Sequence, residues 1–282
     1  MRIVRTVDEM RAAAVAARTT GQSVGLVPTM GAFHGGHLSL MKRARTQNDL
    51  VVVSLFVNPT QFGPAEDLSA YPRDELQDTV LAEAEDVDIL FIPSRDQMYP
   101  DGFATTVHVA GISEVLDGAA RPGHFDGVAT VVAKLFAIVA PDAAYFGQKD
   151  AQQVLVVRRM VRDLDLPVRI EVCPIVREPD GLAMSSRNAY LDDAARAQAT
   201  ALNQALVAAE AVVELGETRA EPVLAAARGV LAASGIDPEY LELRSPDDLT
   251  PVTAVAPAAL LAVAARVGAA RLIDNRMLEV SR

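Results

Sequence analysis

The sequence predicts an α/β protein, with a parallel sheet covered by helices on both faces and a smaller α+β domain after it. Short runs of apolar and β-branched residues alternate with helical patterns through the first two thirds of the 282-residue chain, which is typical of parallel sheets. The segment 50–57 is almost continuously apolar, as in a strand buried on both faces. From about residue 176, Ala-rich helical segments are followed by short strand-like ones. These patterns predict a Rossmann-like domain over 1–175 and a second domain over 176–282.

The predicted elements of the first domain follow one another in the order that such a fold requires. The predicted strands are 24–27, 50–57, 89–92, 143–146 and 168–173, and the predicted helices are 38–48, one opened by Pro72, 128–139 and 151–164. In the helix 38–48, residues 38, 41 and 44 share one apolar face. Because ligands of such sheets bind beyond the carboxyl ends of the strands, the loops that follow the strands are the expected location of the chemistry.

Two helix starts are predicted from capping chemistry. Pro72 is placed at the first helical position, where its missing N–H does no harm, with Asp74 and Glu75 in the first turn. Asp150 is a suitable N-cap for the helix 151–164. In the second domain the predicted helices are 192–215 and 219–234, and the predicted strands are 240–243, 260–265 and 271–273.

The charge of the chain argues against two classes of partner. A net charge of −11 makes the protein a poor general binder of nucleic acids and anionic membranes, so neither is expected as a partner. The most apolar stretch, 254–265, contains Pro257 and is too short to span a bilayer. Residues 1–10 lack the apolar core of a signal peptide. A cytoplasmic location is therefore expected.

The single cysteine, Cys173, excludes an intramolecular disulfide. Within the segment 168–173 it is predicted to be a small buried apolar residue on a strand. The alternative is a catalytic thiol, for which the neighbouring sequence offers no activating base.

The most specific segment follows the first predicted strand and reads Pro28-Thr-Met-Gly-Ala-Phe-His-Gly-Gly-His37. A glycine-bearing loop that leads into a helix presents backbone N–H groups and the positive end of a helix dipole to an anion. His34 and His37 lie three residues apart and can converge on one phosphate. Neither a Walker lysine motif nor G-x-G-x-x-G follows a strand in this chain. A tight turn with two surface histidines is the alternative interpretation, and the H-x-G-H pattern at a strand-to-helix junction favours a functional one.

H-x-G-H on a first βα loop resembles the nucleotidyltransferase superfamily, and the longer string from Pro28 resembles the pantothenate synthetase family. Four further segments match that family in order, and the resemblance covers nearly the whole chain. They are 56–62 (FVNPTQF), 123–127 (GHFDG), 146–153 (FGQKDAQQ) and 184–188 (MSSRN). Gly35 departs from the Glu that is common in the family, at a position to which no chemistry is assigned.

The resemblance implies an ATP site at three places in the chain. Its residues would be Met30, Gly31, Ala32, Phe33, His34, Gly35, Gly36 and His37, then Gly147, Gln148, Lys149 and Asp150, then Val176, Met184, Ser185, Ser186 and Arg187. Lys149 lies between a strand end and a helix start, a position at which a phosphate would bind. In the family this lysine contacts the ATP phosphates. The segment from Met184 resembles the K-M-S-K-S signature, and its hydroxyls and arginine can hold a polyphosphate.

The resemblance also implies the substrates. Gln61 corresponds to a family contact with pantoate and then β-alanine, and Gln153 to a second pantoate contact. Sequence alone leaves each open as a solvated glutamine. Arg121 is a further candidate for neutralising an anionic substrate, whereas His108 and His124 are read as structural. The family further implies Mg²⁺ accompanying ATP, without named protein ligands, and a homodimer.

The implied activity is ATP-dependent joining of pantoate to β-alanine through a pantoyl adenylate, with release of AMP and pyrophosphate. The donors expected at the reacting phosphorus are His34, His37, Lys149, Ser185, Ser186 and Arg187. One rival is a cofactor adenylyltransferase, whose product keeps the nucleotide and against which the Gln61 and Gln153 segments argue. The other is a non-catalytic nucleotide-binding protein, which would require the loss of most of these phosphate contacts.

Overall fold

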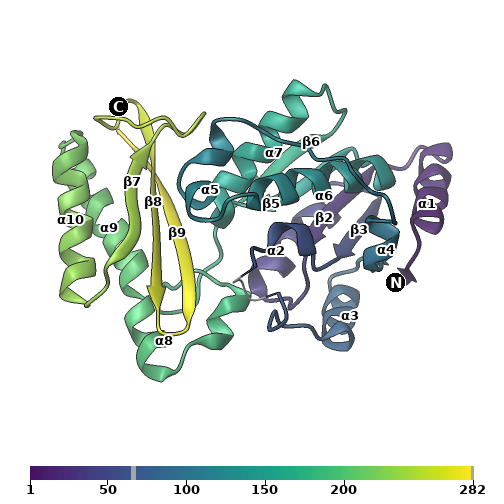
Figure 1. Cartoon of the computed structure of the whole chain (residues 1–282), viewed down its shortest axis with the longest axis horizontal. Coiled ribbons are helices and arrows are strands. Elements are labelled where there is room, and N and C mark those ends of the chain that lie inside the picture. Colours follow the sequence, from purple (N-terminus) through teal and green to yellow (C-terminus); the bar gives the residue numbers. More distant parts are fainter. Residues whose placement is uncertain (65–67, 281–282) are drawn as a thin grey trace. The chain divides into compact units, whose positions relative to one another are not determined.

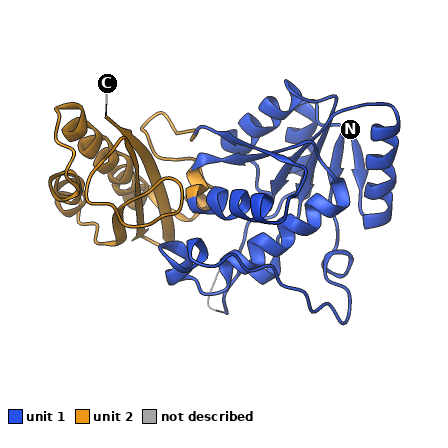
Figure 2. Cartoon of the chain, turned by 90° about the horizontal axis from the view of Figure 1, so that it is seen from above, with its two compact units in different colours: residues 1–148, 152–174 blue, residues 149–151, 175–282 orange. Residues whose placement is uncertain are grey.

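The computed structural model describes residues 1–64 and 68–280, and the chain divides into two compact units. Unit 1 consists of Met1–Gln148 and Gln152–Pro174, and unit 2 consists of Lys149–Ala151 and Ile175–Arg282 (Figure 2). No helix among the described residues is long and apolar enough to cross a membrane.

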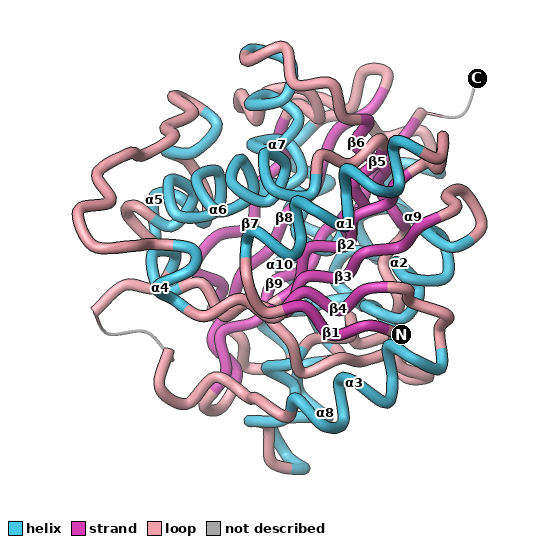
Figure 3. Tube along the Cα trace, turned by 90° about the vertical axis from the view of Figure 1, so that its right-hand side faces the viewer, coloured by secondary structure: helices cyan, strands magenta, loops and turns pink. Residues whose placement is uncertain are grey.

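Unit 1, which runs from purple to teal in Figure 1, is built on a parallel six-stranded sheet. The strand order is β1-β4-β3-β2-β5-β6 (Figure 3). The strands are β1 Arg2–Val4, β2 Val24–Thr29, β3 Leu50–Leu55, β4 Ile89–Phe91, β5 Ala143–Gly147 and β6 Arg169–Cys173. The main helices are α1 Val7–Thr19, α2 Gly35–Arg45, α3 Glu75–Ala84, α6 His124–Val139 and α7 Ala151–Asp163. Shorter helical segments are η1 Pro59–Gln61, α4 Arg95–Met98, η2 Ile112–Glu114 and α5 Asp117–Ala120. The predicted fold class is confirmed.

Helices cover both faces of this sheet. Helix α1 contacts α6 on one face and α2 contacts α3 on the other (Figure 3). On the second face, Met41 and Ala44 of α2 are fully buried in one apolar cluster with Val51 and Val53 of β3 and with Tyr145. Cys173 belongs to the same cluster, and burial raises the pKa of its thiol, so the structural interpretation of this cysteine is confirmed.

The start of α3 differs from its prediction, whereas α7 begins at Ala151 as predicted. Helix α3 begins at Glu75, because the Asp74 carboxylate accepts the N–H of Gln77 at 2.9 Å, so Pro72 is not its first residue. Asp150 lies in the 3₁₀ turn η3 Gln148–Asp150, directly before α7.

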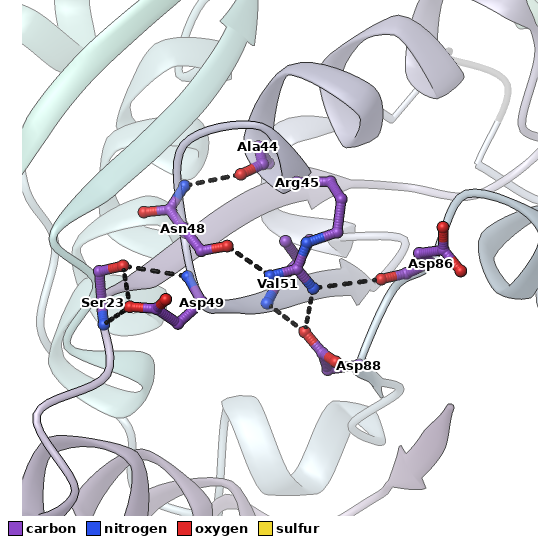
Figure 4. Close-up of polar contacts among 8 residues, drawn as sticks. All are labelled: Ser23, Ala44, Arg45, Asn48, Asp49, Val51, Asp86 and Asp88. Carbon is purple, nitrogen blue, oxygen red and sulfur yellow. Dashed lines mark hydrogen bonds and ion pairs between the residues drawn. The ribbon is translucent and has the colours of Figure 1, made fainter.

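The amino ends of the strands are joined by a polar network (Figure 4). Asp49 accepts both the N–H and the hydroxyl of Ser23, at 2.9 and 2.7 Å, and thereby joins the residues before β3 and β2. Asp88 accepts the N–H of Val51 at 2.7 Å and a bond from Arg45 at 2.6 Å. The Arg45 guanidinium also bonds the carbonyl of Asn48. The network therefore ties the end of α2 to the starts of β3 and β4.

Unit 2 contains Ala-rich helices and a three-stranded antiparallel sheet in the order β7-β8-β9. The elements are the 3₁₀ helix η4 Ser186–Tyr190, α8 Asp193–Ala199, α9 Ala201–Glu214, α10 Ala220–Ala233, β7 Pro238–Arg244, β8 Ala258–Val267 and β9 Ala270–Glu279. The predicted single helix 192–215 is wrong, because α8 and α9 are separated at Thr200, whose hydroxyl bonds the Ala197 carbonyl at 2.8 Å. The small alanines of α9 let the helix pack closely in the core of this unit.

Candidate active site

The histidine loop connects β2 to α2 at the carboxyl edge of the sheet. His34 caps the helix, since its Nδ1 accepts the N–H of Gly36 at 3.1 Å. The Nδ1 of His37 in turn accepts the N–H of His34 at 3.3 Å, and the two ring centroids lie 4.2 Å apart. Because both Nδ1 atoms act as acceptors, the proton of each neutral ring is on Nε2. Each imidazole therefore presents an Nε2–H donor.

Gln61 ends the 3₁₀ turn that follows β3, and its side chain is buried and oriented. Its Oε1 accepts from the Nδ2 of Asn58 at 3.0 Å, and its Nε2 lies 3.1 Å from the sulfur of Met30. The Oδ1 of Asn58 accepts from the hydroxyls of Thr60 and Tyr99 at 2.9 and 2.8 Å, which fixes Nδ2 as the donor. The structure thus brings Gln61 to the histidine loop with its donor side toward Met30.

Arg121 and His124 lie beside the same turn. The Nδ1 of His124 is 2.7 Å from the Gln61 carbonyl, and Arg121 approaches that carbonyl at 3.4 Å and the His124 ring at 3.0 Å. His124 therefore supports the backbone of Gln61, in agreement with its structural interpretation. His108 is at an exposed position, 2.8 Å from the Asp126 carboxylate.

Gln153 is partly buried in the first turn of α7. In the described part of the chain, no hydrogen bond joins its side chain to Gln61. Gly147 and Gln148 lie at the end of β5 and in the following 3₁₀ turn.

In unit 2, Lys149 lies in the short turn that precedes α7. Its ammonium group is 3.5 Å from the Asp150 carboxylate, and its side chain is 20% exposed. The backbone carbonyl of Lys149 accepts from the Nδ2 of Asn275 at 2.8 Å. Asn275 is buried on β9, and nothing in the local sequence around Lys149 indicates this partner.

Unit 2 also holds Val176 and the segment that begins at Met184, which flank a small antiparallel bridge between Arg177 and Ala183. The N–H of Met184 donates to the Val176 carbonyl at 3.0 Å. The hydroxyl of Ser185 accepts the N–H of Arg187 at 3.3 Å and caps the 3₁₀ turn that contains Ser186 and Arg187. The turn therefore starts with two hydroxyls and a guanidinium close together in the chain.

The described residues contain no group of three or more His, Cys, Asp or Glu side chains able to hold a metal ion.

Comparison with known proteins decides the family. The model of the pantoate-β-alanine ligase family matches residues 2–277. The chain belongs to the pantoate-β-alanine ligase family. It is 55% identical to a pantothenate synthetase of Roseiflexus castenholzii over 280 residues, covering 99% of this chain and all of that one. It is 54% identical to one of Koribacter versatilis over 282 residues, covering 100% of this chain and 97% of that one.

Solved structures of this ligase family have the same fold over the whole chain. A pantothenate synthetase of Thermus thermophilus superposes with a TM-score of 0.94 at 49% identity, and covers 100% of both chains. A pantoate-β-alanine ligase of Francisella tularensis, complexed with β-γ ATP and β-alanine, superposes with a TM-score of 0.81 at 34% identity over 98% of this chain and 97% of that one. The resemblance inferred from the motifs, and the enzyme class with it, is confirmed.

Proposed function

We propose that this ligase activates pantoate with ATP as a pantoyl adenylate and then transfers the pantoyl group to β-alanine, forming pantothenate. The pantoate carboxylate is a poor acyl donor, because its leaving group would be oxide. Its attack on the α-phosphorus of ATP expels pyrophosphate and yields a mixed anhydride whose leaving group is AMP. The neutral amine of β-alanine attacks the acyl carbon, AMP departs, and the amine loses its proton.

The two Nε2–H donors of His34 and His37 carry this proposal. Their Nδ1 atoms accept backbone N–H groups, so each neutral ring carries its proton on Nε2, at the start of a helix whose dipole favours an anion. Negative charge develops on the phosphoryl oxygens in the transition state, and donors fixed in place lower that barrier. Lys149, Ser185, Ser186 and Arg187 are proposed to act on the same polyphosphate.

Gln61 and Gln153 are the proposed pantoate contacts. Asn58 holds the Gln61 amide with its oxygen occupied, so that its NH₂ group is the donor for a carboxylate or hydroxyl oxygen. The adenine is proposed to lie beside Val176. Mg²⁺ is proposed to enter with ATP and to supply positive charge at the phosphates, as is usual for this ion.

The remaining features are proposed on the strength of the family. The domain 176–282 is proposed to close over the active site in 1–175, because the adenylate must be protected from water. The enzyme is proposed to be a cytoplasmic homodimer, and sedimentation at micromolar concentration tests the dimer independently of the chemistry.

The experiment that tests the mechanism is exchange of labelled pyrophosphate into ATP. Pantoate, ATP and Mg²⁺ should support exchange without β-alanine, and addition of β-alanine should release AMP and pantothenate. Exchange that requires β-alanine would exclude a free adenylate step, and release of ADP would overturn the whole scheme.

A further inference from the structure

The side chain of Asp78 is directed at the histidine loop from a different element. Asp78 lies on α3 and is only 2% exposed. Its Oδ2 accepts the N–H of Ala32 at 2.8 Å and its Oδ1 accepts the N–H of Phe33 at 2.7 Å. Both oxygens of one buried carboxylate are therefore bonded to consecutive backbone groups immediately before His34.

The loop has a shape that requires such support. Ala32 has a φ of +53°, a left-handed conformation that is costly for a residue with a Cβ. Gly31 has a φ of +87°, and a Cβ at that position would lie 2.9 Å from the Oδ2 of Asp78. Because Gly31 and Ala32 are both left-handed, the N–H groups of Ala32 and Phe33 are directed into one concavity. Backbone concavities of this kind bind anions. The anion bound here is the Asp78 carboxylate itself.

This arrangement has a cost that a purely apolar contact would avoid. Burial raises the pKa of Asp78, while its hydrogen bonds from Phe33 and Ala32 oppose that rise. A carboxylate close to a loop that is to receive a triphosphate also repels the ligand. The negative charge of Asp78 is therefore explained by the two backbone N–H groups that its oxygens accept, and not by attraction to the substrate.

We infer that Asp78 is a positioning residue, which fixes the backbone of Ala32 and Phe33 so that His34 and His37 are held in place for the ATP phosphates. The inference rests on the proposed function of those two histidines. In this inference the N–H groups of Ala32 and Phe33 bond Asp78 and do not bind phosphate. The phosphates are then bound by the two imidazoles and the first turn of α2.

Asp78→Asn is the sharpest test, because it keeps the size of the side chain. An amide has one acceptor and one donor group, so one of the two N–H groups would face another donor. A buried donor left unsatisfied costs enough to change an equilibrium by roughly 5- to 150-fold. We expect kcat/KM for ATP in pyrophosphate exchange to fall about tenfold or more, within that range, while the KM for pantoate changes little.

Asp88→Asn is the matched control. Asp88 also accepts a backbone N–H, that of Val51 at 2.7 Å, but it does so at the amino ends of the strands (Figure 4). It should lower the unfolding temperature without changing kcat/KM for ATP. Hydrogen exchange of the amides at 32 and 33 should accelerate in Asp78→Asn only, which reports on the contact directly. Asp78→Glu, with both oxygens displaced by one methylene, should show the same ATP-selective loss and replaces Asp78→Asn should that variant fail to fold.

The possible outcomes separate this inference from the proposed function. If the unaltered enzyme shows no pantoate-dependent exchange, the proposed function fails. If that exchange is present and the Asp78 variants lose stability as Asp88→Asn does, with kcat/KM for ATP unchanged, the positioning role is overturned and the proposed function stands.

Discussion

The two edges of the parallel sheet in unit 1 use the same kinds of polar contact for different purposes. At the amino edge, Asp88 and Arg45 bond the backbone where strands start and a helix ends. At the carboxyl edge, Asp78 holds the backbone of the histidine loop and Asn58 holds the side chain of Gln61. The bonds have similar lengths, but only the second set supports side chains that are proposed to meet the substrates. Position relative to the strand ends therefore distinguishes function from stability.

This comparison predicts opposite responses to mutation at the two edges. Loss of a contact at the amino edge should lower stability and leave kinetics unchanged. Loss of one at the carboxyl edge should change kinetics for one substrate in particular, because each network supports a separate part of the site.

The largest effect is expected for the histidines and Lys149. We expect His37→Ala, His34→Ala and Lys149→Ala to reduce the adenylation rate by about 10²–10³, roughly 2.7–4 kcal/mol each, which is typical for loss of one transition-state donor. His34→Ala should also lower the unfolding temperature, because the ring caps α2, so the rates are compared where each variant is fully folded. Amide formation from chemically prepared pantoyl adenylate and β-alanine should be impaired much less, because that step starts with its leaving group installed.

Arg45→Met at the amino edge is the control for this prediction. It removes the bonds to Asp88 and to the Asn48 carbonyl, so it should lower the unfolding temperature and leave adenylation unchanged. Equal loss in both half-reactions of the histidine variants would mean that these residues hold AMP throughout, and the transition-state role would be abandoned.

A smaller effect is expected for the glutamines. Gln61→Ala and Gln153→Ala should each remove the proposed hydrogen bonds to pantoate, at a cost of roughly 1–3 kcal/mol. The kcat/KM for pantoate should fall accordingly, while ATP affinity, measured by calorimetry, stays close to its original value. Gln47→Ala is the matched control, because Gln47 accepts the Tyr145 hydroxyl at 2.8 Å near the amino edge. An equal loss of ATP affinity in the glutamine variants would show that the assignment is wrong.

Two glycines, Gly127 and Gly25, allow the same substitution to be made at each edge of the sheet. A Cβ on Gly127 would lie 2.4 Å from the Thr60 carbonyl oxygen, in the turn that presents Gln61. A Cβ on Gly25 would lie 2.5 Å from the Asn48 side chain at the other edge. Overpacking of this kind typically costs about 1–3 kcal/mol, so both alanine variants should be less stable in urea. Only Gly127→Ala should raise the KM for pantoate, and a similar rise in Gly25→Ala would break the distinction between the edges.

The sequence was sufficient to predict the parts of this fold that depend on local pattern. Strands β2 to β5 are buried runs of apolar residues, and these strands and β6 were each located within a few residues. Strand β1 has only three residues and gives no such pattern, and α1 was not predicted either. Its start carries a readable signal, since Thr6 and Glu9 form a capping box.

The supporting residues of the site could not be predicted in this way. Asp78 is 46 residues from Ala32, and Asn275 is 126 residues from Lys149. No periodicity or capping rule relates positions so far apart, because their contact is created only when the sheet and its helices assemble. The motifs therefore predict which residues meet the substrates, whereas the structure is needed to identify what holds those residues.

The smallest effect is expected for the exposed pair of His108 and Asp126. Asp126 is adjacent to Gly127 in the chain, but the pair supports no loop of the candidate site. The His108 side chain is 53% exposed, and Asp126 lies 2.8 Å from its Nδ1. The hydrogen bond to Asp126, with its charge, raises the pKa of His108 above its ordinary value. The pair therefore stabilises the fold fully below pH of about 6.5, the unfolded value, and this contribution is lost as the pH rises through the raised folded pKa.

Asp126→Asn should bring that pKa back toward its ordinary value, as measured by NMR titration of the His108 ring. Because exposed ion pairs contribute little, the unfolding temperature should change only slightly, and only at acidic pH. The kcat/KM values for ATP and pantoate should stay unchanged, in contrast to Gly127→Ala. A loss of pantoate use in Asp126→Asn would show that proximity to the carboxyl edge is sufficient to affect the site. The distinction between contacts that hold a loop of the site and contacts that merely lie near it would then have to be given up.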